Sequence, residues 1–252
     1  NNLDDSNGFH NPYEETKFLA EKKIHAYSIN HGLTFTIYRP SIIIGNSRTG
    51  YTKNFDNIYF YAKNLSFLKR RLVSNVHENE PDLNGLNETK IEKPTMIPLR
   101  IPANPDATIN LVPIDYVVNA IMSISLDRNR INSTFHIVNP YPPTLSFILE
   151  SINEAISVTG PSIVDYNEFK TKEMTPLEKT VLKKLEIYNL YMHNEPHFQS
   201  NNTLKILNDF CIKCPKVTKR MFSVLITYAI ANKWGNDNNN QINIQYPTLN
   251  NE

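Results

Sequence analysis

Residues 11–50 constrain the fold more than any other part of the sequence, because a helix pattern, a strand pattern and a glycine-containing loop follow one another there. Residues 13–27 contain no glycine or proline, and residues 30–32, Asn-His-Gly, are a typical helix end with glycine near the C′ position. Residues 33–39 are rich in β-branched and aromatic side chains and predict a strand. A helix, a strand and the loop 45–50 make one αβ step of an open sheet, where ligands bind beyond the carboxyl ends of the strands.

Tyr13 and Lys17 stand four residues apart, so they project from one side of the predicted helix about one turn apart. Ala20, Ile24 and Tyr27 continue the same side at helical spacing, which predicts that this stripe faces inward. A lysine on a buried stripe is rare unless its charge is needed there. The alternative is that Tyr13 is an ordinary core aromatic and that the ammonium of Lys17 extends out to water.

Two blocks carry a family resemblance: residues 11–21 read NPYEETKFLAE and residues 38–50 read YRPSIIIGNSRTG. Together they resemble the extended short-chain dehydrogenase/reductases, and most closely the thioester-reductase and fatty acyl-CoA reductase branch. A bare Tyr-x-x-x-Lys occurs by chance in many proteins. The two blocks in this order across a helix and a strand are far more specific.

The resemblance implies a role for each matching residue. A tyrosine has a pKa near ~10, and a cation one helical turn away favours its phenolate, so Tyr13 would act as the general acid for a carbonyl. Lys17 would lower the pKa of Tyr13 and would bind the nicotinamide ribose. NADPH is the expected cofactor, and NADH stays open because no residue that selects between them can be identified. The positions whose backbone would face the nicotinamide are Pro40, Ser41, Ile42 and Ile43.

Arg48 has two interpretations. It is either a solvated loop arginine or a substrate-binding cation that meets a phosphate of coenzyme A or of a carrier's phosphopantetheine arm. On the second interpretation the substrate is an acyl thioester on coenzyme A or on a carrier protein, and Gly45 and Gly50 let a linear chain pass close to the loop. Two other functions stay open: a nucleotide-sugar epimerase or dehydratase of the same superfamily, and a non-catalytic, truncated NAD(P)-binding-like module.

In the rest of the chain, strand and helix patterns first alternate, and the later part is mostly helical. Residues 109–112 predict a short strand, Pro113 and Asp115 are ordinary signals for the start of a helix through about Leu126, and residues 134–138 predict another strand. Further helices are expected at 145–158, 176–193, 201–210 and 216–234, where apolar residues recur at helical spacing.

The sequence contains no G-x-G-x-x-G turn for a pyrophosphate and only 7 glycines. We therefore expect the carboxyl-terminal part of a longer oxidoreductase, with activity of the 252-residue piece alone in doubt. The predicted fold class is α/β, the second half of a doubly wound, Rossmann-like sheet with a mostly helical substrate lobe. The expected boundaries are 1–143 for the partial Rossmann-like domain, 144–235 for the helical lobe and 236–252 for a flexible tail.

Composition limits the classes of partner that the protein can bind. The chain is 40% hydrophobic and 20% charged with a net charge of +1, so it can build a core and has no electrostatic bias toward nucleic acid. No apolar run is long enough to span a membrane and no signal peptide is visible, so we expect a cytoplasmic protein. Cys211 and Cys214 are interpreted as reduced thiols without a metal, and His136 as a structural residue.

Overall fold

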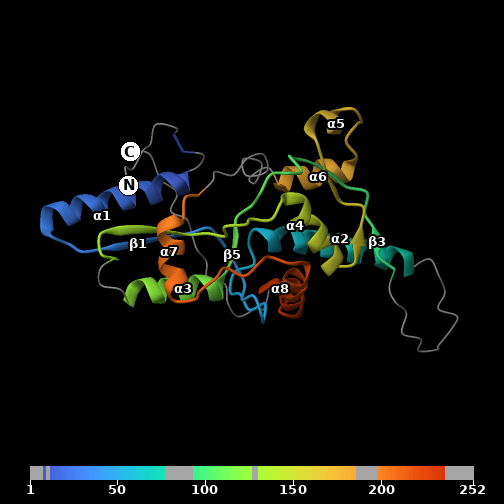
Figure 1. The fold of residues 1–252 in the computed structure, drawn as a ribbon. Helices are drawn as coiled ribbons and strands as arrows, with labels where there is room; N and C mark the ends of the chain where they lie inside the picture. Colours follow the sequence, from blue (N-terminus) through green and yellow to red (C-terminus); the bar gives the residue numbers. More distant parts are fainter. Residues whose placement is uncertain (1–7, 10–11, 78–92, 127–129, 186–197, 236–252) are drawn as a thin grey trace.

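The computed structural model describes residues 8–9, 12–77, 93–126, 130–185 and 198–235 (Figure 1). They form a mixed α/β fold whose strand pairs are all parallel. The strands are β1 (Thr36–Pro40), β2 (Ile42–Ile44), β3 (Thr95–Met96), β4 (Arg100–Pro102), β5 (Leu111–Pro113), β6 (Ser133–Ile137), β7 (Val158–Thr159) and β8 (Ser162–Val164). The helices are α1 (Pro12–His31), α2 (Ile58–His77), α3 (Ile114–Leu126), α4 (Leu145–Ala155), α5 (Tyr166–Lys170), α6 (Pro176–Leu185), α7 (Asn201–Asp209), α8 (Lys219–Ala231) and the 3-10 turn η3 (Lys233–Gly235).

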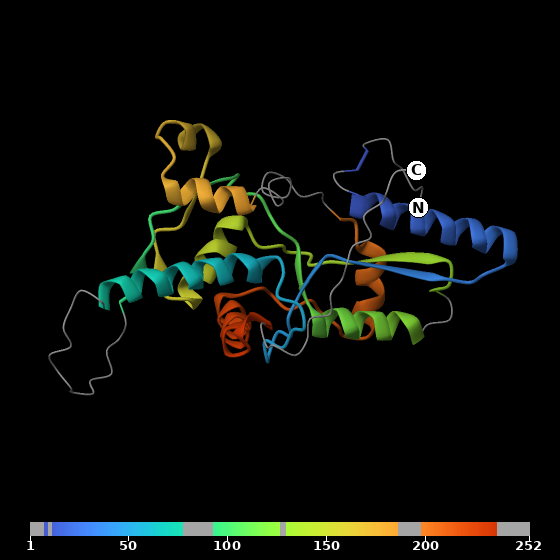
Figure 2. The same cartoon turned by 180° about the vertical axis from the view of Figure 1, so that it is seen from behind.

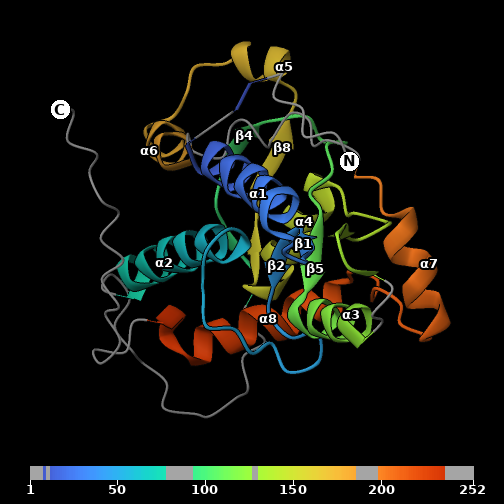
Figure 3. The ribbon, with the colours of Figure 1, turned by 90° about the vertical axis from the view of Figure 1, so that its left-hand side faces the viewer.

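One end of the molecule is a three-layer arrangement, with α1 on one face of the β1–β6 pair and α3 on the other (Figures 1 and 3). β1 and β6 run in register from Thr36 opposite Ser133 to Pro40 opposite Ile137. A small core of α3, α7, β5 and β6 side chains fills the α3 side. This arrangement confirms the α/β class and the helix–strand order predicted for residues 11–50.

The strand that follows α1 changes its partner at Ser41. The Ser41 N–H donates to the carbonyl of Ile137 at 3.1 Å, and the next N–H, of Ile42, donates to the carbonyl of Asn110 at 3.2 Å. The chain therefore pairs with β6 through β1 and with β5 through β2. This switch carries the chain from the α1–β1 layer into the second half of the molecule.

The expectation that the Tyr13 stripe faces inward is wrong. Tyr13 is 69% exposed and Tyr27 is 60% exposed. The side of α1 turned toward β1 lies about a quarter of a turn away at 100° per residue, and its one buried residue is Glu21. Glu21 forms an ion pair with Arg39 of β1 at 2.6 Å, so a charged contact rather than apolar burial sets the rotation of α1.

The other end of the molecule packs α2, α4 and α8 around a larger apolar core, with α5 and α6 on its outer side (Figures 1 and 2). Two short strand pairs, β3–β7 and β4–β8, run beside these helices and are not foreseen by the helical patterns. Both pairs join strands from opposite sides of residue 143. The expected domain boundaries stay a prediction, and the tail 236–252 lies outside the described residues.

Helix ends follow the local sequence signals closely. Gly32 has φ +67° and its N–H reaches the carbonyl of Ser28, which is the predicted end of α1. α3 begins after Pro113 and ends at Leu126, as predicted, and the Thr144 side chain caps α4. None of the helices in the described ranges is both long and apolar enough to cross a membrane.

Candidate functional site

The pair at the start of α1 lies together, as the four-residue spacing predicts. The ammonium nitrogen of Lys17 is 5.2 Å from the centre of the Tyr13 ring, which is a cation–π distance. Both side chains are exposed, and the Thr16 hydroxyl donates to the Tyr13 carbonyl at 2.9 Å within the first turn. The tyrosine and its cation are therefore adjacent and open to a ligand.

A chain of polar contacts ties α1 to the end of β6. Arg39 donates to Glu21 through Nε at 2.9 Å and contacts His136 Nε2 through Nη1 at 3.1 Å. Because a guanidinium can only donate, His136 Nε2 must accept, and its Nδ1–H then donates to the Gln199 carbonyl at 2.9 Å. His136 is thus a structural residue, as interpreted from the sequence, and its tautomer follows from its partners.

The predicted cofactor segment, residues 40–43, lies where β1 passes into β2. The hydroxyl of Ser41 donates to Asn110 Oδ1 at 2.7 Å, and the same oxygen accepts the Asn139 N–H at 2.8 Å. Asn110 Nδ2 returns a hydrogen bond to the Asn139 carbonyl at 2.9 Å. Two buried asparagines therefore hold this segment in place. No spacing rule predicts such a buried amide pair.

Arg48 lies at the exposed tip of a tightly held turn. Asn46 Oδ1 accepts the N–H groups of Arg48 and Thr49, each at 3.0 Å. Ser47 donates to the Asp115 carboxylate through its backbone N–H at 2.8 Å and its hydroxyl at 2.7 Å. The sequence explains Asp115 only as an acid at a helix start, so its second task of anchoring this loop is visible in the structure alone.

Gly45 and Gly50 do not leave room for a substrate, contrary to the expectation that a linear chain passes close to the loop. Gly50 has φ +74°, and a Cβ built there would lie 2.5 Å from the Val224 carbonyl oxygen. A Cβ on Gly45 would lie 2.8 Å from the Tyr59 hydroxyl. The space beside both glycines is already filled, because they bring the loop against α2 and α8.

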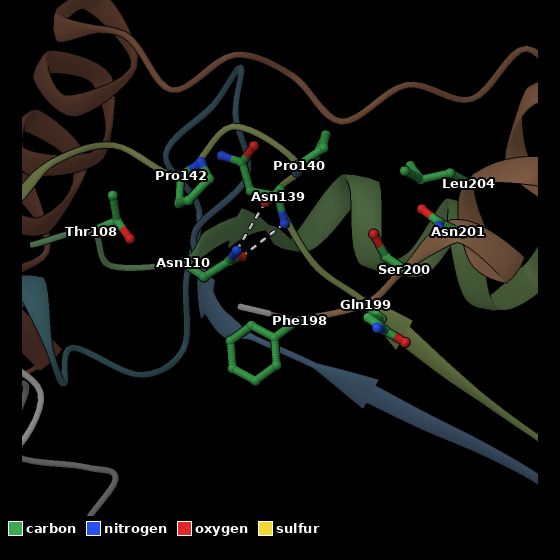
Figure 4. Close-up of a pocket in the computed structure, with 10 residues that line it drawn as sticks. All are labelled: Thr108, Asn110, Asn139, Pro140, Pro142, Phe198, Gln199, Ser200, Asn201 and Leu204. Carbon is green, nitrogen blue, oxygen red and sulfur yellow. Dashed lines mark hydrogen bonds between the residues drawn. The ribbon is translucent and has the colours of Figure 1, made fainter. Parts of the chain in front are cut away.

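A pocket of about 310 Å³ lies where the loop after β6 meets the start of α7 (Figure 4). Its polar side chains are the amides and hydroxyls of Thr108, Asn110, Asn139, Gln199, Ser200 and Asn201. Its apolar side chains are those of Pro140, Pro142, Phe198 and Leu204. Since Asn110 also holds Ser41, one wall of the pocket is shared with the predicted cofactor segment.

Burial keeps the Tyr59 phenol and the Cys214 thiol neutral. Burial raises the pKa of Tyr59 to about 12, against the opposing effect of the Gly45 N–H that its oxygen accepts. Burial, with a smaller contribution from nearby Asp115, raises the pKa of the Cys214 thiol to about 12. Cys214 is therefore a protonated, unreactive thiol at neutral pH. Within the described ranges, no group of three or more His, Cys, Asp or Glu side chains is placed to hold a metal ion.

The residues present fit the nicotinamide end of a dinucleotide. Lys17 and Tyr13 offer an exposed ammonium and hydroxyl side by side. The N–H groups of Ser41 and Ile42 are already used in the sheet, so a carboxamide at this segment must use its other backbone groups. No hydrogen bond or ring contact among the described residues joins the Tyr13–Lys17 pair directly to residues 40–43. Their two elements are linked through Glu21 and Arg39.

Comparison with known proteins adds a family match and a fold match. A family model described as male sterility protein matches residues 1–121, which include Tyr13, Lys17 and the loop with Arg48. The chain is 18% identical over 222 residues to a component of the linear gramicidin synthase of Brevibacillus parabrevis, covering 86% of this chain and 4% of that one. This chain therefore spans a small part of that relative.

Two reductase structures share the fold. The terminal R domain from the myxalamid PKS-NRPS biosynthetic pathway matches with 23% identity and a TM-score of 0.57, covering 88% of this chain and 50% of that one. A thiolation-reductase di-domain from an archaeal non-ribosomal peptide synthetase matches with 16% identity and a TM-score of 0.58, covering 90% of this chain and 42% of that one.

An epimerase shares the fold as well. Mth375 from Methanothermobacter thermautotrophicus matches with 11% identity and a TM-score of 0.54, covering 91% of this chain and 53% of that one. At such low identities these structures establish the fold alone. The chain spans about half of their length or less.

Proposed function

We propose that the chain is part of an extended short-chain dehydrogenase/reductase of the thioester-reductase branch and takes part in the NADPH-dependent reduction of an acyl thioester, supported by the family match to residues 1–121 and the relative in a peptide synthetase. The nicotinamide cofactor follows from the family, and the choice of NADPH over NADH belongs to the proposal. The observation that carries the proposal is the pair at the start of α1, with the Lys17 ammonium 5.2 Å from the Tyr13 ring.

When bound, the reduced nicotinamide supplies the hydride. Tyr13 donates its hydroxyl proton to the oxygen of the carbonyl that is being reduced. Lys17 favours the charge that Tyr13 develops as the proton leaves, because an opposite charge nearby stabilises a phenolate. Its ammonium also binds the ribose hydroxyls, and the backbone of Pro40, Ser41, Ile42 and Ile43 orients the nicotinamide ring.

Glu21 and Arg39 are positioning residues for Tyr13 and Lys17. Their ion pair at 2.6 Å sets the rotation of α1 on β1, and so sets the direction in which Tyr13 and Lys17 project. Arg48, held at the loop tip by Asn46, meets a phosphate of coenzyme A or of a carrier's prosthetic arm. The related synthase and the thiolation-reductase di-domain make a carrier-bound thioester the favoured form of the substrate.

Tyr13→Phe tests the proposal in a protein that carries this chain. NADPH oxidation should be followed with a long-chain acyl-CoA and with an acyl-carrier thioester, and turnover should fall about 10²-fold or more with little change in cofactor affinity. Tyr27→Phe is the matched control, because Tyr27 is another exposed tyrosine of the same helix. Lys17→Ala should lower both turnover and cofactor affinity.

Two results would contradict the proposal. Full activity of Tyr13→Phe would show that Tyr13 is not the general acid. Turnover of UDP- or dTDP-hexoses, with none on any thioester, would move the assignment to a nucleotide-sugar epimerase.

A further inference from the structure

We infer that the pocket at the start of α7 binds a neutral chain of secondary amides, of the kind found in a pantetheine arm or in a peptidyl group. The inference rests on the proposed function and adds the part of the substrate that does not react. The pocket of about 310 Å³ is at the small end of the ~300–1,000 Å³ typical of ligand sites.

The lining indicates a neutral ligand. None of the ten described residues that line the pocket carries an ionisable side chain, so a phosphate or a carboxylate would lose its hydration without gaining an opposite charge. Primary amides supply much of the polar lining, and each can both donate and accept. A secondary amide needs one acceptor and one donor, which such a lining offers together.

One wall of the pocket is rigid. Asn110 and Asn139 are 4% and 3% exposed and are bonded to each other through two hydrogen bonds of 2.8 and 2.9 Å. Asn139 Oδ1 also accepts the Tyr141 N–H at 2.9 Å, which shapes the loop after β6. This wall therefore keeps its form before any ligand arrives.

The opposite wall of the pocket has polar side chains that are available to bind a ligand. Within the part of the chain that the structure describes, the side chains of Gln199, Ser200 and Asn201 make no hydrogen bond. Ser200 is only 7% exposed and stands at the N-cap of α7, yet its hydroxyl caps nothing. N-cap serines ordinarily bond the first turn of their helix. Figure 4 shows the side-chain oxygens of Ser200 and Asn201 directed toward the Asn139–Pro140 side of the pocket.

A chain of polar contacts that begins on α1 fixes the position of this wall. The His136 Nδ1–H donates to the Gln199 carbonyl, and the His136 ring stands edge-on to the Phe198 ring with centroids 6.1 Å apart. His136 is held in turn by Arg39, the partner of Glu21. The same polar chain therefore orients the catalytic helix and this wall of the pocket.

The test is a calorimetric or NMR titration of the 252-residue chain with pantetheine and, separately, with N-acetyl-dialanine N-methylamide. Asn201→Leu removes an amide from the wall, and its affinity for the bound compound should be about tenfold weaker, as expected for one lost hydrogen bond. Ser200→Ala should weaken binding in the same direction. Asn208→Leu is the matched control, because Asn208 lies two turns further along α7 and outside the lining.

Tighter binding of pantetheine supports the pocket and assigns the carrier arm as its source, and tighter binding of the dipeptide supports it and assigns the acyl part. Binding of neither compound, or equal affinity of Asn201→Leu and Asn208→Leu, would overturn the inference. Tyr13→Phe should leave amide binding unchanged. Amide binding by an unsubstituted protein that reduces no thioester would therefore count against the proposed function alone.

Discussion

Glu178→Gln should destabilise the chain by about 2–3 kcal/mol at neutral pH. The Glu178 side chain is 2% exposed and accepts Arg100 Nε at 2.7 Å and Nη2 at 2.9 Å. It also accepts the backbone N–H groups of Thr175 at 2.8 Å and of Arg100 at 3.2 Å. These contacts join α6 to β4, and the substitution leaves the Arg100 guanidinium facing a neutral amide.

The size of the expected loss in unfolding free energy follows from the pKa of Glu178. The Arg100 hydrogen bonds lower this pKa from 4.5 to about 2, with the Thr175 and Arg100 N–H groups adding to the shift and burial opposing it. A depression of this size corresponds to about 3 kcal/mol of stability, reduced somewhat because Arg100 is 22% exposed. Because the folded pKa is the lower one, the contribution is complete above the unfolded pKa of 4.5 and is lost as the pH falls toward 2.

Urea unfolding followed by the fluorescence of Trp234, the single tryptophan, measures this difference. Trp234 lies in the apolar core beside α4 and α8, against which Leu177 and Val181 of α6 pack. The difference in unfolding free energy between the parent and Glu178→Gln should be smaller by about half at pH 3 than at pH 7.

The control is Glu150→Gln, which breaks an exposed pair with Lys219 and should cost only a small fraction of the stability lost in Glu178→Gln, because water screens an exposed pair. A cost for Glu178→Gln as small as that of the control, or one that does not vary with pH, would refute the reasoning.

Three further predictions concern the loop that carries Arg48. Arg48→Ala should raise KM for a coenzyme A or carrier thioester more than it lowers kcat, because it removes contact with a non-reacting part of the substrate; steady-state kinetics decide this. Asp115→Ala should cost about 1–3 kcal/mol in urea unfolding, since it leaves both Ser47 donors unpaired. Gly50→Ala should cost about 2–4 kcal/mol, since its φ is +74° and the new Cβ would meet the Val224 carbonyl; unchanged thermal stability would contradict this.

Local signals predict many elements of this chain well. The end of α1 at Gly32, the start of α3 after Pro113 and the strand at residues 133–137 depend on contacts within a few residues, so the sequence carries them directly. The short strands β3, β4, β7 and β8 are not predicted, because strands of two or three residues have too few side chains to show a period.

The rotation of α1 could not be predicted from periodicity. An apolar stripe faces inward only when another element covers it, and here the covering element meets the helix at Glu21 instead. The choice depends on Arg39, which is 18 residues away in sequence and lies on another element. The expectation for the loop glycines is wrong for the same reason, since the atoms that fill the space beside Gly50 belong to α8.

The sequence by itself determined the α/β class and the adjacency of Tyr13 and Lys17, because a four-residue step on a helix places two side chains together whatever surrounds them. Only the tertiary structure decided that Asp115 anchors the Ser47 turn and that Asn110 pairs with Asn139. It alone brought the start of α7 against the loop after β6 to form the amide-lined pocket. These two pairs join residues that are 68 and 29 positions apart in sequence, and such contacts follow from the packing of the whole chain rather than from any local pattern.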